Sequence, residues 1–102
     1  MTIRQVGKNT YNEQEGFGTY VILDGAANTT GAVIRTAVLE CGSNGFARLL
    51  VGGMPVLGAG DGGNVQSATL ASPITVPPGV RIQWVNTSAA QSSCFVSWEA
   101  LP

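Results

Sequence analysis

The segment 80–101, VRIQWVNTSAAQSSCFVSWEAL, decides the fold class of this chain. Val80, Ile82 and Trp84 alternate with polar residues, and a period of two resumes at Cys94. Such alternation is typical of a β-strand that buries one face and exposes the other. Because a polar run, 86–93, separates the two stretches, the segment predicts strands at 80–86 and 94–101 joined by a loop.

Similar patterns occur upstream of this segment. Asp24-Gly25, Gly52-Gly53 and Pro77-Pro78-Gly79 mark turns between runs rich in β-branched and aromatic residues. No long window shows helical periodicity, and 14 glycines and 5 prolines disfavour long helices. We therefore predict an all-β fold, an antiparallel β-sandwich. Its further strands are expected at 17–23, 32–41, 46–51 and 54–57, with Pro55 keeping 54–57 at a sheet edge. Residues 65–70 and 73–76 are expected as two short strands or as one bent strand.

The longest of these strands, 32–41, has apolar side chains on both of its alternating faces. This is expected where a strand is covered on both sides for part of its length. The two predicted faces are Val33, Arg35, Ala37, Leu39 and Cys41 on one side, and Ile34, Thr36, Val38 and Glu40 on the other.

The chain divides into a polar beginning and a β-rich remainder. Its 102 residues suit one domain with one core. Residues 1–16 hold few large apolar side chains, so we expect an N-terminal arm, or a weak first strand, that packs on a neighbouring molecule. Residues 17–102 are expected to form a single sandwich domain, with the glycine-rich stretch 58–64 as a loop inside it.

The charge content limits the possible partners. Charged residues make up 11% of the chain and the net charge is −1. The few basic residues are scattered along the sequence, whereas nucleic-acid binding needs a cluster of them. We therefore predict no nucleic-acid partner. No apolar run approaches the length that crosses a bilayer, so no membrane partner is expected. Residues 1–6 lack a hydrophobic signal core, which predicts a chain made in the cytoplasm without Sec-type export.

Residues that carry chemistry are scarce. The chain has no histidine, so Ser/His/Asp and Cys/His catalysis are excluded. Cys41 and Cys94 have no metal-site spacing and are expected as small buried side chains, with a disulfide left open. Gly58, Gly60 and Gly63 match a nucleotide-loop spacing, but no helix follows them. Asp61 and Asn64 could ligate calcium, but they offer too few oxygens. We predict no enzyme, no cofactor and no metal.

Two further sets of residues are candidates for binding. Trp84 and Trp98 share the phase of apolar neighbours and are expected in the core, although with Tyr11 and Tyr20 they could instead form a sugar-stacking platform. Asn28 and Asn86 begin glycosylation sequons that we interpret as turns. The predicted interface residues are Tyr11, Glu13, Glu15, Tyr20, Asp61 and Asn64.

Four stretches carry a family resemblance: NTTGAVIR (28–35), FARLLVGG (46–53), PITVPPGV (73–80) and FVSWE (95–99). In this order, over residues 17–102, the chain resembles small bacteriophage virion structural proteins. The resemblance implies a jelly-roll-like sandwich that serves as a head decoration, head-to-tail or tail-associated component. It carries over no functional residue, because the matched pattern belongs to the scaffold.

The leading functional hypothesis is therefore a structural virion protein. We expect a capsid decoration or cement protein, located in the virion and acting as a homo-oligomer, with a trimer favoured, against capsid or other virion proteins. The alternative is a receptor- or carbohydrate-binding module of a phage tail or head fibre. The exposure of Trp84 and Trp98 discriminates between them, since a tryptophan exposed in a groove favours sugar binding.

Overall fold

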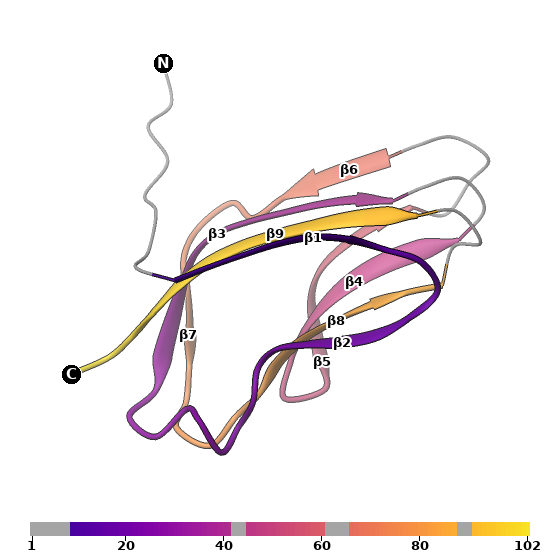
Figure 1. Cartoon of the computed structure of the whole chain (residues 1–102). Helices are drawn as coiled ribbons and strands as arrows, with labels where there is room; N and C mark the ends of the chain where they lie inside the picture. The colour runs from indigo at the N-terminus through magenta and orange to yellow at the C-terminus, as the bar shows by residue number, and fades with distance from the viewer. Residues whose placement is uncertain (1–8, 42–44, 61–65, 88–90) are drawn as a thin grey trace.

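A computed structural model describes residues 9–41, 45–60, 66–87 and 91–102, and these form two β-sheets packed face to face (Figure 1). The described residues include no helix, and every strand pair is antiparallel. This confirms the predicted antiparallel β-sandwich. The strands are β1 (Asn9–Glu15), β2 (Gly18–Leu23), β3 (Ala32–Cys41), β4 (Phe46–Val51), β5 (Met54–Gly60), β6 (Gln66–Thr69), β7 (Ile74–Val76), β8 (Ile82–Asn86) and β9 (Ser92–Ala100).

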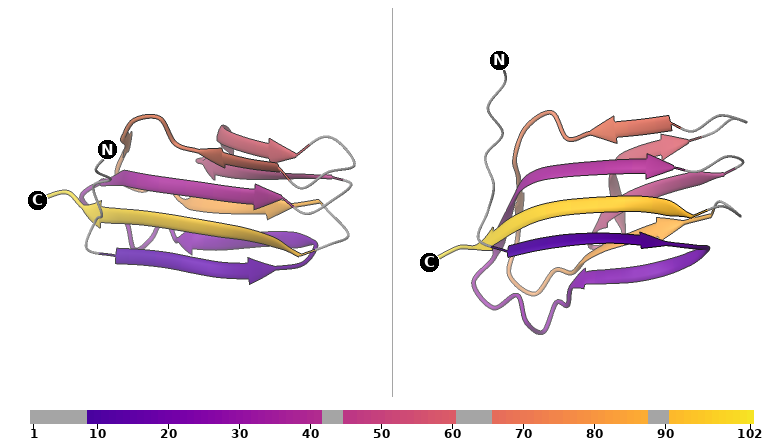
Figure 2. Two further views of the ribbon diagram at one scale, coloured as in Figure 1. Left: turned by 90° about the horizontal axis from the view of Figure 1, so that it is seen from above. Right: turned by 45° about the horizontal axis from the view of Figure 1, so that its top comes forward.

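The order of the strands follows from one long folded hairpin. Sheet A has the order β1-β9-β3-β6, with β7 also paired to β3, and sheet B has the order β2-β8-β4-β5. Thus β1 pairs with β9, β2 with β8, β3 with β6 and β7, and β4 with β5. The pairs nest around the turn at Gly52-Gly53, where both residues have positive φ, of 59° and 83°. Both figures show the hairpin wrapped so that its strands lie in two layers (Figure 2).

The core lies between the two sheets. The largest completely buried side chains are Trp84, Ile34, Leu39, Leu49 and Ile82. Each buried aliphatic side chain of this size contributes about 1.5–3 kcal/mol to folding. Trp84 therefore occupies the core position predicted for it. Trp98 is partly buried and packs against the same core.

A β-bulge changes the predicted faces of strand β3. The pairing with β9 shifts between Ile34 and Thr36, which leaves Arg35 as an extra residue. Ile34 consequently joins the core cluster together with Ala37, whereas Val33 does not. The prediction that Val33, Arg35 and Ala37 share one face is wrong for this reason: strict alternation fails where one residue has no partner.

The predicted polar arm 1–16 needs correction for its second half. Residues 9–15 form β1, which pairs with β9 along its whole length, from Asn9 opposite Trp98 to Glu15 opposite Ser92. Backbone hydrogen bonds do not require apolar side chains, and an edge strand keeps one side open to water. A polar sequence can therefore complete a sheet at its edge, as the weak-strand alternative allowed. Residues 1–8 lie outside the described residues.

The remaining strand predictions differ mainly at their ends. Strands β3 and β4 have the predicted bounds, and β5 is an edge strand as Pro55 indicated. Strand β5 also includes residues 58–60, which were expected in the glycine-rich loop. Strand β8 begins at Ile82, because Val80 still belongs to the preceding turn and its N–H donates to the carbonyl of Pro77.

Candidate functional site

The predicted tyrosines close one side of the sandwich. Tyr20 on β2 lies opposite Trp84 on β8, with ring centroids 5.2 Å apart. Tyr11 approaches from sheet A, and its hydroxyl accepts a hydrogen bond of 3.0 Å from Nε1 of Trp84. The hydroxyl of Tyr20 donates to the carbonyl of Gly16 at 2.9 Å. The structure thus brings Tyr11 and Tyr20 together around Trp84, and both tyrosines are half-buried.

The other predicted interface residues that the structure describes make no side-chain contact with Trp84 comparable to those of the two tyrosines. Glu13 is exposed and Glu15 is half-buried on the edge strand β1. The backbone carbonyl of Glu15 accepts a hydrogen bond from Nδ2 of Asn86 at 3.1 Å. Asp61 and Asn64 lie outside the described residues.

Burial controls the titration of two groups near this cluster. Desolvation raises the pKa of Tyr11, and the nearby Cys94, Glu13 and Glu15 raise it further, while the hydrogen bond from Trp84 lowers it. Burial raises the pKa of the Cys94 thiol to about 12. Cys94 therefore stays protonated near neutral pH and is a poor nucleophile.

The two cysteines are buried and free, on the neighbouring strands β3 and β9. Their burial is as predicted, and the disulfide that the sequence left open does not form. Within the described ranges, no group of three or more potential metal-ligating side chains comes together.

Both sequon asparagines are structural. Asn28 is 3% exposed, and its Nδ2 donates to the carbonyls of Pro77 and Val80, each at 2.9 Å. Asn86 is completely buried, and its Oδ1 accepts a hydrogen bond from the hydroxyl of Ser92 at 2.9 Å. These side chains hold loops and strand ends together, so the turn interpretation of the two sequons understated their role.

Apolar side chains make up much of the outer surface of sheet B. Leu49, Trp84 and Tyr20 are aligned across three strands with their side chains on the core side. Their neighbours along each strand therefore point outward. We call this outward surface the sheet B face. Its central residues are Thr19, Val21, Arg48, Leu50, Gln83 and Val85, with Phe46 two residues before Arg48 on the same side of β4.

The sheet B face is partly open to solvent, because Val21 and Arg48 are exposed while its other apolar side chains are half-buried. Val21 is 56% exposed. The ribbon views show no third layer over the face among the described residues (Figure 2). Sequence reasoning missed this surface, although strand 46–51 is apolar on both alternating faces, which is the signal of a strand covered on both sides. Apolar side chains that stand partly open to solvent on the outside of a sheet are candidates for contact with another protein.

Charge is divided unequally between the two sheets. Arg48 is the single charged residue in the strands of sheet B, and its guanidinium lies 4.0 Å from the centroid of the Phe46 ring. The strands of sheet A carry four glutamates and one arginine. That arginine, Arg35, forms an ion pair with Glu99 at 2.6 Å.

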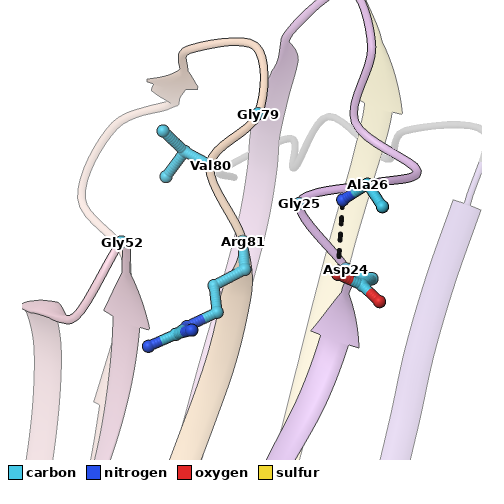
Figure 3. Close-up of a pocket in the computed structure, with 7 residues that line it drawn as sticks. All are labelled: Asp24, Gly25, Ala26, Gly52, Gly79, Val80 and Arg81. Carbon is cyan, nitrogen blue, oxygen red and sulfur yellow. Dashed lines mark hydrogen bonds between the residues drawn. The ribbon is translucent and has the colours of Figure 1, made fainter.

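A shallow hollow of about 470 Å³ lies at one end of sheet B (Figure 3). Loop backbone forms most of its wall, and a Cβ added to Gly25 would stand 2.5 Å from the carbonyl oxygen of Gly79. Its charged groups are Asp24, which accepts a hydrogen bond from the Ala26 N–H, and the exposed Arg81. These two charged side chains are exposed and do not point toward a common position (Figure 3), so they do not form a catalytic arrangement. The lining residues are Asp24, Gly25, Ala26, Gly52, Gly79, Val80 and Arg81.

Comparisons with known proteins return no match to this chain, whether with protein-family models, with curated proteins or with solved structures. The part of the chain that the structure describes holds no helix with the length and apolar character to span a membrane.

Proposed function

We propose that this protein functions by assembly, as a structural component of a bacteriophage virion that decorates or cements the capsid. The observation that carries the proposal is the sheet B face, whose four apolar side chains are exposed or half-buried, with no further layer over them among the described residues (Figure 2). An uncovered apolar surface of this kind costs solubility, and contact with another protein surface offsets that cost. The low charge content of the chain supports the same interpretation, because a weakly charged surface loses little solvation when it is covered.

The strand order supports the proposal from the side of the fold. We infer that the nested hairpin, wrapped into the sheets β1-β9-β3-β6 and β2-β8-β4-β5, is a jelly roll in which β6 and β7 act as one interrupted strand. Jelly rolls are common in viral capsid and lectin domains. Because one fold hosts several functions, this likeness supports a virion role only together with the exposed face.

The alternative, carbohydrate binding, is less favoured. A sugar platform needs aromatic rings open to the ligand, but Trp84 is completely buried and Trp98 packs against the core. The described residues that line the hollow at the end of sheet B include no aromatic one. A glycan array probed with the purified protein tests this alternative, and specific binding to one sugar class would favour it over assembly.

The test of the proposed function is the composition and stability of virus particles. We expect mass spectrometry of purified particles to find this chain in many copies per particle. Particles made without its gene are expected to lose infectivity faster on heating and osmotic shock than complete ones, and added purified protein should restore their resistance. Absence of the chain from purified particles would reject the proposal, and equal survival of the two kinds of particle would reject the cement role.

A further inference from the structure

The sheet B face has a complementary surface on the same molecule. Strand β1 is the free edge of sheet A, with Glu13 exposed on it and Glu15 half-buried. The turn that follows β1 carries Phe17, whose side chain is 74% exposed, the highest exposure among the large apolar residues described. We call this second surface the β1 edge, defined by Glu13, Glu15 and Phe17.

The two surfaces match in both charge and polarity. The sheet B face offers apolar side chains, including Val21, Leu50 and Val85, around a single cation, Arg48. The β1 edge offers an aromatic side chain beside two acids. Neither Arg48 nor Glu13 forms an ion pair with any other residue that the structure describes. A buried aromatic anchor with a charge pair at its rim is the usual composition of a protein interface.

We propose that the sheet B face of one molecule binds the β1 edge of a second copy of this chain, with Phe17 on the apolar face and Glu13 near Arg48. This contact rests on the proposed assembly function and gives it a partner and a geometry. It joins two different surfaces, so each molecule can bind one neighbour on each side. Such heterologous contacts close into a ring when the rotation between copies allows it and otherwise extend as a filament.

A face-to-face dimer through the sheet B face is the competing arrangement. It would place the single positive charge of that face, on the inner strand β4, in one interface with its own copy, and the strands of sheet B hold no acid to compensate the two charges. Like charges that meet across an interface cost binding free energy, whereas opposite charges favour both encounter and correct alignment. The charge distribution therefore favours the β1 edge as the partner surface.

The experiment is a charge swap on the full chain, followed by sedimentation velocity over a wide range of protein concentration. Arg48→Glu and Glu13→Arg are each expected to weaken self-association by about tenfold or more, because each places like charges together. The double variant, which restores an opposite pair in reversed order, is expected to recover most of the association. Phe17→Ser is expected to abolish it, and since Phe17 is exposed, this variant should keep its thermal midpoint.

Glu40→Arg is the matched control, because Glu40 is an exposed acid on sheet A away from the β1 edge. It should leave association unchanged. Association that survives Glu13→Arg and Phe17→Ser but changes with Arg48→Glu would overturn the inference in favour of the face-to-face dimer. A wild-type chain that stays monomeric throughout would also overturn it, and the particle composition would then decide separately whether the chain is a virion component.

Discussion

The indole nitrogen of Trp84 shows how single polar atoms are accommodated in this core. It lies on a completely buried side chain, yet its hydrogen reaches the hydroxyl of Tyr11 on the opposite sheet. Among the described residues, no buried side-chain nitrogen or oxygen lacks a hydrogen-bond partner. An unpaired buried polar group costs about 1–3 kcal/mol, so these pairs constrain how the sheets align.

Tyr11→Phe tests the pair directly. The change removes the acceptor but keeps the ring, and it should lower the free energy of unfolding by about 1–2 kcal/mol because the Trp84 N–H loses its partner. Urea denaturation measures the effect. Tyr20→Phe is the control, since its hydroxyl bonds only to backbone carbonyls near the surface, and it should cost less. Equal effects of the two changes would contradict this account.

Cys94 predicts a pH dependence at the alkaline end. The folded thiol keeps its proton up to about pH 12, whereas the ordinary pKa is 9.0, so between these values unfolding releases a proton. The stabilising contribution is fully present below about pH 9 and declines as the pH rises, by about 1.4 kcal/mol per pH unit.

The pKa of Tyr11 is also raised, so folding loses further stability as the pH rises above 10.0, the ordinary pKa of tyrosine. The free energy of unfolding of wild type and Cys94→Ala is measured by denaturation between pH 9 and about 10. This interval lies below the main tyrosine titration, so the difference between the two proteins reports the Cys94 thiol. The variant should lose less stability over that interval, and identical slopes would contradict the assignment.

At the scale of the element, the hairpin β4–β5 depends on a close backbone approach at Gly60. Gly60 lies opposite Phe46 with φ of 120°, and an added Cβ would overlap the carbonyl oxygen of Gly45 and stand 2.7 Å from the Cα of Phe46. Backbone atoms cannot rotate away as side chains can. The glycine-rich sequence here therefore serves strand pairing, where the sequence pattern had indicated a loop.

Gly60→Ala is expected to lower the free energy of unfolding by about 3 kcal/mol, through both steric overlap and an unfavourable φ. Gly53→Ala is the matched control: its φ is 83°, but no atom lies within 4 Å of the added Cβ. Only the conformational cost remains there, about 1 kcal/mol. Thermal denaturation compares the two, and a Gly53→Ala variant as unstable as Gly60→Ala would contradict the steric argument.

At the scale of the whole molecule, Asn28 links parts of the chain that are far apart in sequence. Its amide joins the β2–β3 loop to the segment between β7 and β8, and its own carbonyl accepts the N–H of Gly79 at 2.7 Å. This cluster fixes one end of the sandwich. The nested hairpin needs such long-range contacts, because strands near the end of the chain pair with strands near its beginning.

Asn28→Asp tests this tie. At neutral pH a carboxylate cannot donate to the carbonyls of Pro77 and Val80 and is repelled by them, so we expect a loss of about 3 kcal/mol in unfolding free energy. Lowering the pH should recover part of it relative to wild type, because a protonated carboxyl donates one hydrogen bond. Asn28→Ala is the control and should show no such recovery. A pH-independent loss in both variants would contradict the hydrogen-bond account.

The sequence by itself determined the local features of this protein. Alternation in 80–86 and 94–101, and turn residues such as Gly52-Gly53, act between near neighbours, so the β class, most strands and the core position of Trp84 could be predicted. The bulge at Arg35, the pairing of the polar strand β1 and the buried roles of Asn28 and Asn86 could not, because each depends on a partner distant in sequence.

The candidate interaction surface shows the same division. An apolar run such as 46–51 indicates that both faces of a strand can be covered, but it does not indicate what covers them. Only the tertiary structure decided that one face meets sheet A while the other, with the half-buried Leu50, has no further layer over it among the described residues (Figure 2). The physical reason is that burial is a property of the assembled sheets, whereas periodicity belongs to each strand alone.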